Sequence, residues 1–309
     1  MPSNKDSRTV CPSLVHKQAA SEVLITALDV DLDGWTAHAR LEPRHRFYHD
    51  VTGRQSSYND PLYALEAFRQ GCIAAGHLIY RVPLGFHYLV RSYEFAVLDW
   101  GALETCREPA DLEFRTHVRR EFRPDPRAPV NGLEVTATAS RNGVSAMSLS
   151  VSFGWVAESR WQPMRARSRW EAGIQPFTVD PVTVGRRLAE NVVVGAPLQR
   201  RDDGSVCAPV VVDTRNPTFF DHPLDHLPGS LILEACRQLA LAALGPRSST
   251  VLGPSRLRCE FRSFAELQPS CVASLAPVPG ALAFRGKVSQ SGQDRALVEL
   301  DFATVESPE

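Results

Sequence analysis

The hydrophobic positions of the chain follow two periods, and the same order of periods occurs twice. In the first half, strand-like apolar runs at 22–30 and 35–41 flank a turn at Asp33-Gly34. A polar loop follows, and then a segment at about 61–80 that is apolar on nearly every side, which predicts a buried helix. Strand-like runs at 88–99, 110–122, 132–140 and 145–155 complete this half.

The second half repeats this order. Strand-like runs at 191–194 and 206–214 precede a shorter loop and a predicted helix at about 229–244, and four runs follow at 250–261, 270–278, 282–290 and 295–305. A helix that is apolar around most of its circumference must be enclosed rather than laid on a surface. The pattern therefore predicts an α+β fold, a double hotdog in which two tandem repeats each wrap an antiparallel sheet around a central helix.

The two predicted helices share their polar residues as well as their apolar ones. Aligned, they pair Pro61 with Pro228, Glu66 with Glu234, Arg69 with Arg237 and Gln70 with Gln238, and the Glu and Arg pairs share an offset of 168 residues. Upstream, residues 14–25 align with 183–194 at nearly the same offset, which indicates an internal repeat. We predict an N-terminal tail at 1–13, a first repeat at 14–157, a linker at 158–182 and a second repeat at 183–306.

Composition narrows the class of protein. The chain is 43% hydrophobic and 22% charged, which is typical of a globular domain, and its formal net charge of −1 attracts neither nucleic acid nor anionic membrane. No apolar run is long enough for a membrane helix, and the polar N-terminus does not resemble a signal peptide. The 7 cysteines are scattered without a CxxC pair, which favours reduced thiols in the cytoplasm.

The second helix carries Glu234, Arg237 and Gln238 at positions that project from one face. Three interpretations apply to the Glu–Arg pair: an ordinary exposed ion pair, a buried structural salt bridge, or part of a functional site. The rest of this helix is almost wholly apolar, and buried charges are costly unless they are paired or used. We favour a functional site.

The loop before this helix, DHPLDHLPG at 221–229, contains two Asp-His pairs. Such pairs often only hydrogen-bond the backbone, but Asp221 and His222 are also candidates for substrate contact. No thiol or third spaced histidine completes a zinc site, so we predict no metal. Gly229 allows a ligand close to the backbone, and the free N–H groups at the helix start can polarise a carbonyl.

This segment resembles the central helix of hotdog β-hydroxyacyl-ACP dehydratases, which pair a loop histidine with a helix glutamate. Pro228, Gly229 and Glu234 match that pattern. Phe220 stands where the dehydratase histidine is expected, and His222 is two residues away. Dehydration is therefore not the favoured chemistry.

A broader resemblance covers nearly the whole chain. The motifs VHK at 15–17, FYHD at 47–50, DPL at 60–62, VPLGF at 82–86, NPTFFDHPLDHLPG at 216–229 and LEACRQ at 233–238 are similar to those of the A-factor biosynthesis (AfsA) family. The resemblance implies a tandem-hotdog acyltransferase in γ-butyrolactone, butenolide or furan hormone biosynthesis. It further implies transfer of a β-ketoacyl group from acyl carrier protein to the hydroxyl of dihydroxyacetone phosphate, followed by ring closure to a butenolide phosphate.

The residues suggest how such a transfer would run. We expect the acyl chain between the two central helices, with its thioester carbonyl at the N–H groups near Gly229. Glu234 is the predicted general base, with a pKa that burial raises toward neutrality. Arg237 either fixes that carboxylate or contacts the phosphate. We expect one working site at this pair, with Glu66 and Arg69 shaping it or completing a second site.

Further candidates come from the loops and helices. Because hotdog pairs commonly join the helix of one copy to the loop of the other, we expect Glu234 near His45 and His49, and Glu66 near Asp221 and His222. The substrate-binding candidates are Gly229, His222, Asp221, His49, Arg69, Gln238 and Arg54. The arginines of the first loop are candidate phosphate or carrier-protein contacts, or simply a solvated surface. Cys236 reads as a core residue rather than a nucleophile.

Other functions compete with acyl transfer to dihydroxyacetone phosphate. A thioesterase or dehydratase would act on acyl thioesters without a phosphate acceptor. An acyl-ligand sensor would need a DNA-binding element, and no helix-turn-helix pattern is found. No GxGxxG or Walker loop occurs, so no cofactor is expected. The donor, acyl carrier protein or coenzyme A, stays open, as does the choice between a monomeric pseudo-dimer and a homodimer.

Overall fold

The computed structural model describes residues 10–166 and 175–304. Part of the predicted tail and part of the predicted linker therefore lie outside the described residues. Three α-helices occur within the described ranges: α1 (Pro61–Leu78), α2 (Glu158–Arg165) and α3 (Gly229–Leu244). The described segments hold no helix that is both long and apolar enough to cross a membrane.

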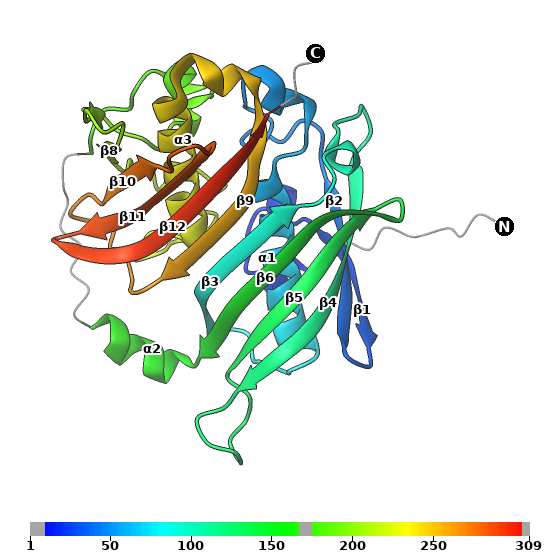
Figure 1. Ribbon diagram of the computed structural model, residues 1–309. Coiled ribbons are helices and arrows are strands. Elements are labelled where there is room, and N and C mark those ends of the chain that lie inside the picture. Colours follow the sequence, from blue (N-terminus) through cyan, green and yellow to red (C-terminus); the bar gives the residue numbers. More distant parts are fainter. Residues whose placement is uncertain (1–9, 167–174, 305–309) are drawn as a thin grey trace.

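One antiparallel sheet runs through both halves of the chain (Figure 1). The first half contributes β1 (Ile25–Asp31), β2 (Gly34–Leu41), β3 (His87–Val97), β4 (Ala110–Phe122), β5 (Gly132–Arg141) and β6 (Val144–Val156). The second contributes β7 (Gln199–Arg200), β8 (Val206–Pro209), β9 (Val251–Phe261), β10 (Val272–Pro277), β11 (Ala283–Gln290) and β12 (Gln293–Thr304).

The strand order shows the repeat directly. It is β1-β2-β4-β5-β6-β3 in the first half and β9-β12-β11-β10-β8-β7 in the second, so each half mirrors the other about the β3–β9 pair. At this central seam Glu94 pairs with Arg258 and Phe95 with Leu257. The two hotdog sheets are thus joined edge to edge by backbone hydrogen bonds, and the double hotdog expected from the sequence is confirmed.

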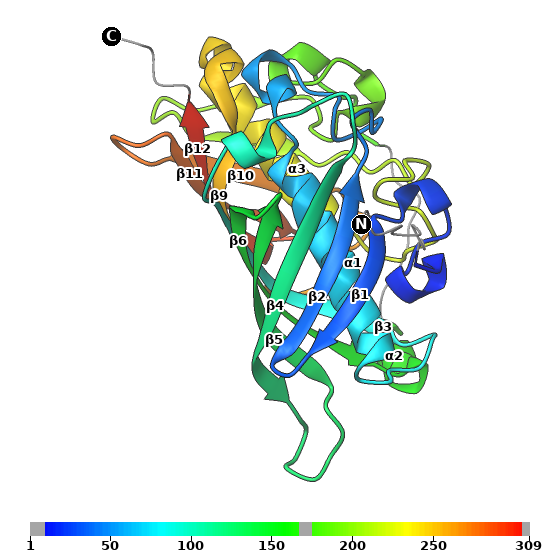
Figure 2. The ribbon, with the colours of Figure 1, turned by 90° about the vertical axis from the view of Figure 1, so that its right-hand side faces the viewer.

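Both long helices lie on the same face of the sheet, as Figures 1 and 2 show from two directions. Nearly every side chain of α1 and α3 is buried, which explains why both read as apolar on all sides. Phe68 of α1 stacks on Phe114 of β4, with ring centroids 5.8 Å apart. This packing anchors the helix that carries Glu66 and Arg69.

Reciprocal contacts tie the two repeats together. The carboxylate of Asp50, in the first repeat, accepts hydrogen bonds from the backbone N–H groups of Arg187 and Leu188, both at 3.1 Å. In the second repeat, Asp221 accepts from the N–H groups of Gln18 and Ala19. Each repeat therefore holds the other's entry loop with a carboxylate.

Three local predictions need correction. The linker contains α2, which the sequence did not predict, and β7 was also missed. Residues 191–194 were expected to form a strand, but only Val194 pairs, in an isolated bridge with Val210. Residues 191–194 do not form a regular strand because the Val193 N–H donates a hydrogen bond to Gln238 Oε1 rather than to the backbone of a neighbouring strand.

Candidate functional site

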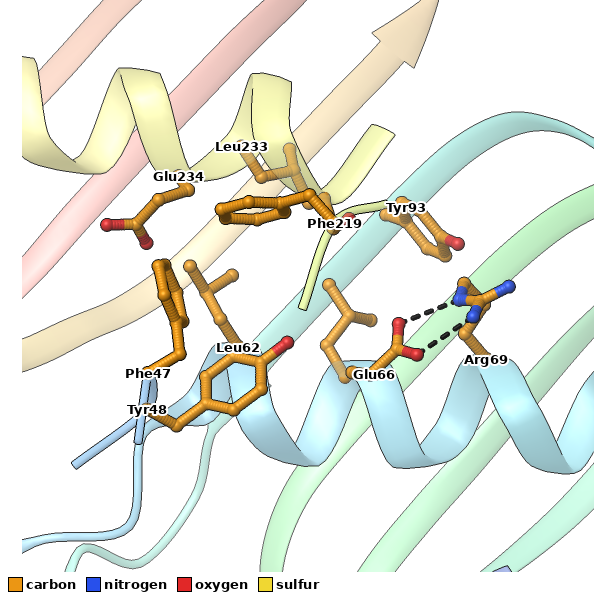
Figure 3. A pocket seen from close by; sticks show the side chains of 11 residues that line it. Phe47, Tyr48, Leu62, Glu66, Arg69, Tyr93, Phe219, Leu233 and Glu234 are labelled. Atoms are coloured by element: carbon orange, nitrogen blue, oxygen red, sulfur yellow. Dashed lines mark hydrogen bonds and ion pairs between the residues drawn. The ribbon is translucent and has the colours of Figure 1, made fainter. Parts of the chain in front are cut away.

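A small pocket, partly open to solvent, lies between α1 and α3. Figure 3 shows Phe219 and Leu233 on the α3 side and Leu62 on the α1 side, with Glu66 and Arg69 at one end. The remaining lining residues are Phe47, Tyr48, Leu65, Tyr93, Ser230 and Glu234. The walls are thus mainly apolar, and the polar groups are few, which is the usual composition of a small-molecule site.

We call Lys17, Glu66, Arg69 and Gln70 the first half-site. Arg69 Nε and Nη2 donate to the two carboxylate oxygens of Glu66 at 2.7 and 2.8 Å (Figure 3). Lys17 Nζ lies 3.2 Å from Glu66 Oε1, and Gln70 Nε2 donates to the same oxygen at 3.0 Å. Burial alone would raise the pKa of Glu66, but Arg69 and Lys17 outweigh it and hold this pKa well below the ordinary value.

We call Arg186, Glu234, Arg237 and Gln238 the second half-site. Glu234 Oε1 accepts from Arg186 Nη2 and Arg237 Nη2, both at 2.7 Å, and from Gln238 Nε2 at 2.5 Å, while Glu234 Oε2 accepts from Arg237 Nε at 2.9 Å. Arg186 is completely buried, and its Nη1 also donates to the carbonyl oxygens of Phe47 and Asp50. The two half-sites are built on one plan, a glutamate held by an arginine, a glutamine and a distant cation.

The predicted protonation behaviour of Glu234 is wrong. Burial does favour a higher pKa, but Arg186 and Arg237 outweigh it, so the pKa of Glu234 lies below its ordinary value rather than near neutrality. Its carboxylate already accepts four hydrogen bonds from side chains. The geometry is that of a buried salt bridge, as in the second interpretation considered from the sequence, and Glu66 is held in a similar way by three hydrogen bonds and an ion pair. The catalytic role expected for Glu234 stays a prediction.

The glutamines have a structural explanation too. Gln238 was expected to contact substrate, but it is fully buried, its Oε1 accepts from the Val193 N–H at 2.9 Å, and its Nε2 also donates to the Asn191 carbonyl. Gln70 does the same in the first repeat with the Leu24 N–H and the Glu22 carbonyl. Both carboxamides brace the entry segment of their own repeat against its helix.

Exposure separates the two half-sites. The side chain of Arg69 is 27% exposed, against 1% for Arg237. Arg237 Nη1 donates to Gln55 Oε1 at 3.3 Å, whereas Arg69 Nη1 makes no hydrogen bond within residues 10–166 and 175–304. The first half-site, and not the second as expected, therefore offers a free donor to a ligand.

The loops exchange between repeats as expected, but through partly different residues. Phe47, Gln55 and Asp60 reach the second half-site, whereas His45 lies 3.5 Å from Glu22 of its own repeat. The His49 ring packs edge-on against the Tyr63 ring, with centroids 6.1 Å apart, and lies near Asp60. Arg54 is exposed, next to Gln55, and makes no ion pair within the described segments.

The loop of the second repeat borders the first half-site. Phe219 lines the cavity with Glu66, and the carboxylate of Asp221 is occupied by the backbone of the first repeat, next to Lys17. His222 is half-buried and has its pKa lowered, first by burial and then by the charge of Arg69. Asp221 thus caps the backbone of the first repeat, and His222 lies near Arg69, whereas a contact of Glu66 with either residue stays a prediction.

Lys17 and Arg186 were missed as partners of the two glutamates. The signal was present, because VHK at 15–17 aligns with VGR at 184–186 and places a cation at the end of both. The chain also bends identically there: His16 and Gly185 both have left-handed backbone, with φ of 55° and 71°. A cation repeated at equivalent positions of two repeats is a usable predictor of a partner for a repeated carboxylate.

Cys236 is fully buried in α3. Burial raises the pKa of the Cys236 thiol to about 12, so it stays protonated, in keeping with a core role. Among the residues that the structure describes, no group of three or more His, Cys, Asp or Glu side chains is placed to hold a metal ion.

Sequence comparison assigns the chain to a family of known proteins. The family model described as the A-factor biosynthesis hotdog domain, AfsA, matches residues 2–156 and 172–272. The chain belongs to the AfsA family. A Streptomyces coelicolor relative of this family is 30% identical over 306 residues, covering 96% of this chain and 92% of the relative. A Streptomyces virginiae relative is 29% identical and covers 88% of this chain and 89% of its own length. Both relatives are named 2-oxo-3-(phosphooxy)propyl 3-oxoalkanoate synthase.

Solved structures agree on the fold of this AfsA-family chain. A putative oleoyl thioesterase from Lactobacillus plantarum superposes with a TM-score of 0.54 at 8% identity, covering 88% of this chain and 96% of its own. The dehydratase domain of RzxB from Pseudomonas fluorescens gives a TM-score of 0.52 at 14% identity, covering 90% and 97%. At such low sequence identities these similarities establish the shared fold. They do not assign a reaction, which must be argued from the residues of the site.

Proposed function

We propose that this protein transfers a 3-oxoacyl (β-ketoacyl) group from a thioester to the hydroxyl of dihydroxyacetone phosphate, as the names of its Streptomyces relatives describe for those proteins. The cavity between α1 and α3 takes the acyl chain, and the first half-site carries the chemistry. The observation that supports this choice of site is the pair of buried Glu66 and partly exposed Arg69 at the end of an apolar cavity. The second half-site stabilises the structure.

The thioester carbonyl is polarised at the start of α3. Ser230 lines the cavity, α3 has no side-chain cap, and the N–H groups of Gly229 and Ser230 have no acceptor among the described residues, so these two are available as donors. These N–H groups stabilise the negative charge that develops on the carbonyl oxygen as the hydroxyl attacks. No nucleophile of the enzyme is needed for this direct transfer.

Glu66 orients the attacking hydroxyl. Its carboxylate is ionised at neutral pH, since Arg69 and Lys17 hold its pKa low, and an ionised carboxylate accepts the hydrogen bond of the hydroxyl. The new C–O bond forms as the C–S bond breaks, and the hydroxyl proton leaves with the thiol.

The first test is mass-spectrometric detection of the product. Purified protein is mixed with a 3-oxoacyl thioester and dihydroxyacetone phosphate, beside the matched variants Glu66→Gln and Glu234→Gln. We expect a new phosphorylated ester, with a loss of about 100-fold or more in rate for Glu66→Gln. Glu234→Gln should mainly lower the melting temperature.

Two outcomes would overturn the proposal. Free 3-oxo acid without an acceptor adduct would make the protein a thioesterase, the class of enzyme for which its Lactobacillus plantarum structural relative is named. Loss of turnover in Glu234→Gln at unchanged melting temperature, with Glu66→Gln fully active, would move the chemistry to the second half-site.

A further inference from the structure

The two central helices begin differently. At α1 the preceding residue is Asp60, whose Oδ1 accepts a hydrogen bond from the Leu62 N–H at 2.9 Å. Its other oxygen, Oδ2, lies 3.9 Å from Arg237 Nη1 and makes no hydrogen bond. A single carboxylate therefore spans the N-terminus of a helix and the arginine of the second half-site.

Before α3 the residue in the same place is Pro228: both are N-cap residues, and the offset of 168 shared by the Glu and Arg pairs aligns Asp60 with Pro228, one residue away from the Pro61–Pro228 pairing expected from the sequence. The backbone is almost the same, with φ and ψ of −65° and 146° at Pro228 and of −62° and 125° at Asp60. Proline supplies no side-chain oxygen, and the N–H of Ser230, the counterpart of Leu62, finds no acceptor in the described chain. Arg69 Nη1, the counterpart of Arg237 Nη1, is also unpaired there. The first half-site thus repeats the donors of the second but lacks the internal carboxylate.

Arg69 and Ser230 both line the cavity between the helices. The remainder of the wall is formed mostly by Phe, Tyr and Leu side chains. A fitting ligand combines an apolar chain with two oxygens held close together on one side. A 3-oxoacyl thioester has these features, because its two carbonyl groups stand on alternate carbons and can point the same way.

We propose that Arg69 recognises the 3-oxo group of the donor, which rests on the function proposed above. The thioester oxygen accepts from the Ser230 N–H and the 3-oxo oxygen accepts from Arg69 Nη1, in the place that Asp60 fills in the second half-site. Arg69 is then the residue that sets donor specificity. A saturated acyl donor leaves this guanidinium nitrogen without a partner, which a site built for the oxygen does not tolerate well.

The main test compares two donors of equal chain length, a 3-oxoacyl thioester and the saturated acyl thioester. The wild-type protein should prefer the 3-oxo donor in kcat/KM. Arg69→Lys keeps a charge paired with Glu66 but loses the second donor face. We expect this variant to lose about 10- to 100-fold of the preference, the range for one hydrogen bond to a charged group. An unchanged preference would overturn the proposal.

A second variant imitates the closed half-site. Pro228→Asp should place a carboxylate on the Ser230 N–H and beside Arg69, as Asp60 does for Leu62 and Arg237. The turnover of the 3-oxo donor should fall about tenfold or more while the melting temperature holds, because aspartate caps helices well. Pro228→Ala, which adds no acceptor, should stay near wild type. Equal activity of both variants would count against the shared binding place.

A binding experiment separates this inference from the proposed function. A β-diketone, in which a methylene replaces the thioester sulfur, is titrated calorimetrically without any acceptor. Wild type should bind it about tenfold or more tightly than the matched simple ketone, and Arg69→Lys should lose this difference. If this holds but no ester forms with dihydroxyacetone phosphate, the acceptor assignment fails and the role of Arg69 stands. If the ester forms but wild type and Arg69→Lys bind the diketone equally well, the role of Arg69 is wrong and the proposed function stands.

Discussion

Arg186 Nη2 lies 2.7 Å from Glu234 Oε1, in a part of the protein with no access to solvent. The same guanidinium donates to the Phe47 and Asp50 carbonyl oxygens and lies over the Phe47 ring, 4.1 Å from its centroid. Arg186 therefore joins the entry loop and the helix of the second repeat to the long loop of the first. The relationship explains why Glu234 sits in an apolar helix: it completes a buried tie between the repeats.

Removing this tie should cost more stability than removing its counterpart. Arg186→Ala should lower the free energy of unfolding by about 3–5 kcal/mol, because it breaks a fully buried ion pair and removes one donor each from the Phe47 and Asp50 carbonyl oxygens. Lys17→Ala should cost clearly less, since Lys17 makes a single contact at 3.2 Å and Glu66 keeps Arg69. Urea unfolding of both variants tests this, and equal losses would contradict it.

His16 should make the protein less stable in mild acid. Burial, followed by the charges of His77 and Arg69, lowers its pKa from the ordinary 6.5 to about 3. Between these two pH values the unfolded chain binds a proton that the folded protein does not, so stability falls as the pH falls from 6.5 toward 3. His16→Gly should flatten this dependence, and denaturant unfolding at a series of pH values measures it.

The control for this prediction is His16→Asn, which also cannot titrate and tolerates the left-handed backbone at φ 55°. Both variants should show the same, weaker dependence of stability on pH. Both should also be less stable than wild type at neutral pH, because each loses the 3.0 Å contact between His16 and His77. A slope as steep as that of wild type in both would show that other groups cause the acid sensitivity.

Gly76 in α1 should not tolerate alanine, although alanine favours helices. A methyl group there would collide with the hydroxyl of Tyr88, which packs directly on this glycine. Gly76→Ala should therefore lower the melting temperature, against the gain of about 1 kcal/mol expected from helix propensity. Tyr88→Phe removes the colliding oxygen, so the double variant should recover part of the loss. Stabilisation by Gly76→Ala alone would refute the close contact.

Much of the fold could be predicted from the sequence because its elements follow simple periods. The segment 110–122 was expected to be a strand and is β4, and the helix expected at 229–244 is α3 with the same bounds. Helix α2 was missed because its own sequence, with Pro163 inside, argues against a helix. Its stability comes from tertiary contacts, such as Trp161 stacked on His87 at 4.2 Å and Arg165 paired with Asp225 and Glu266.

The candidate site was predictable in its residue types but not in its ranking. Glu66, Arg69, Glu234 and Arg237 could be found from spacing alone, and three of them line the cavity. The sequence ranked the second pair first because of its Pro-Gly entry. We propose the opposite order because of the long-range partners, Arg186 on Glu234 and Gln55 on Arg237, which close one half-site and have no local signature.

Both hotdog units belong to one polypeptide, and the β3–β9 seam joins their sheets into one. Two identical chains in a homodimer must carry the same residue before both central helices, so aspartate and proline could not coexist there. A gene that encodes both units lifts this restriction, and each copy can drift on its own. One repeat can then close its half-site with internal contacts while the other keeps its half-site open to a ligand. Two identical subunits related by symmetry cannot differ in this way.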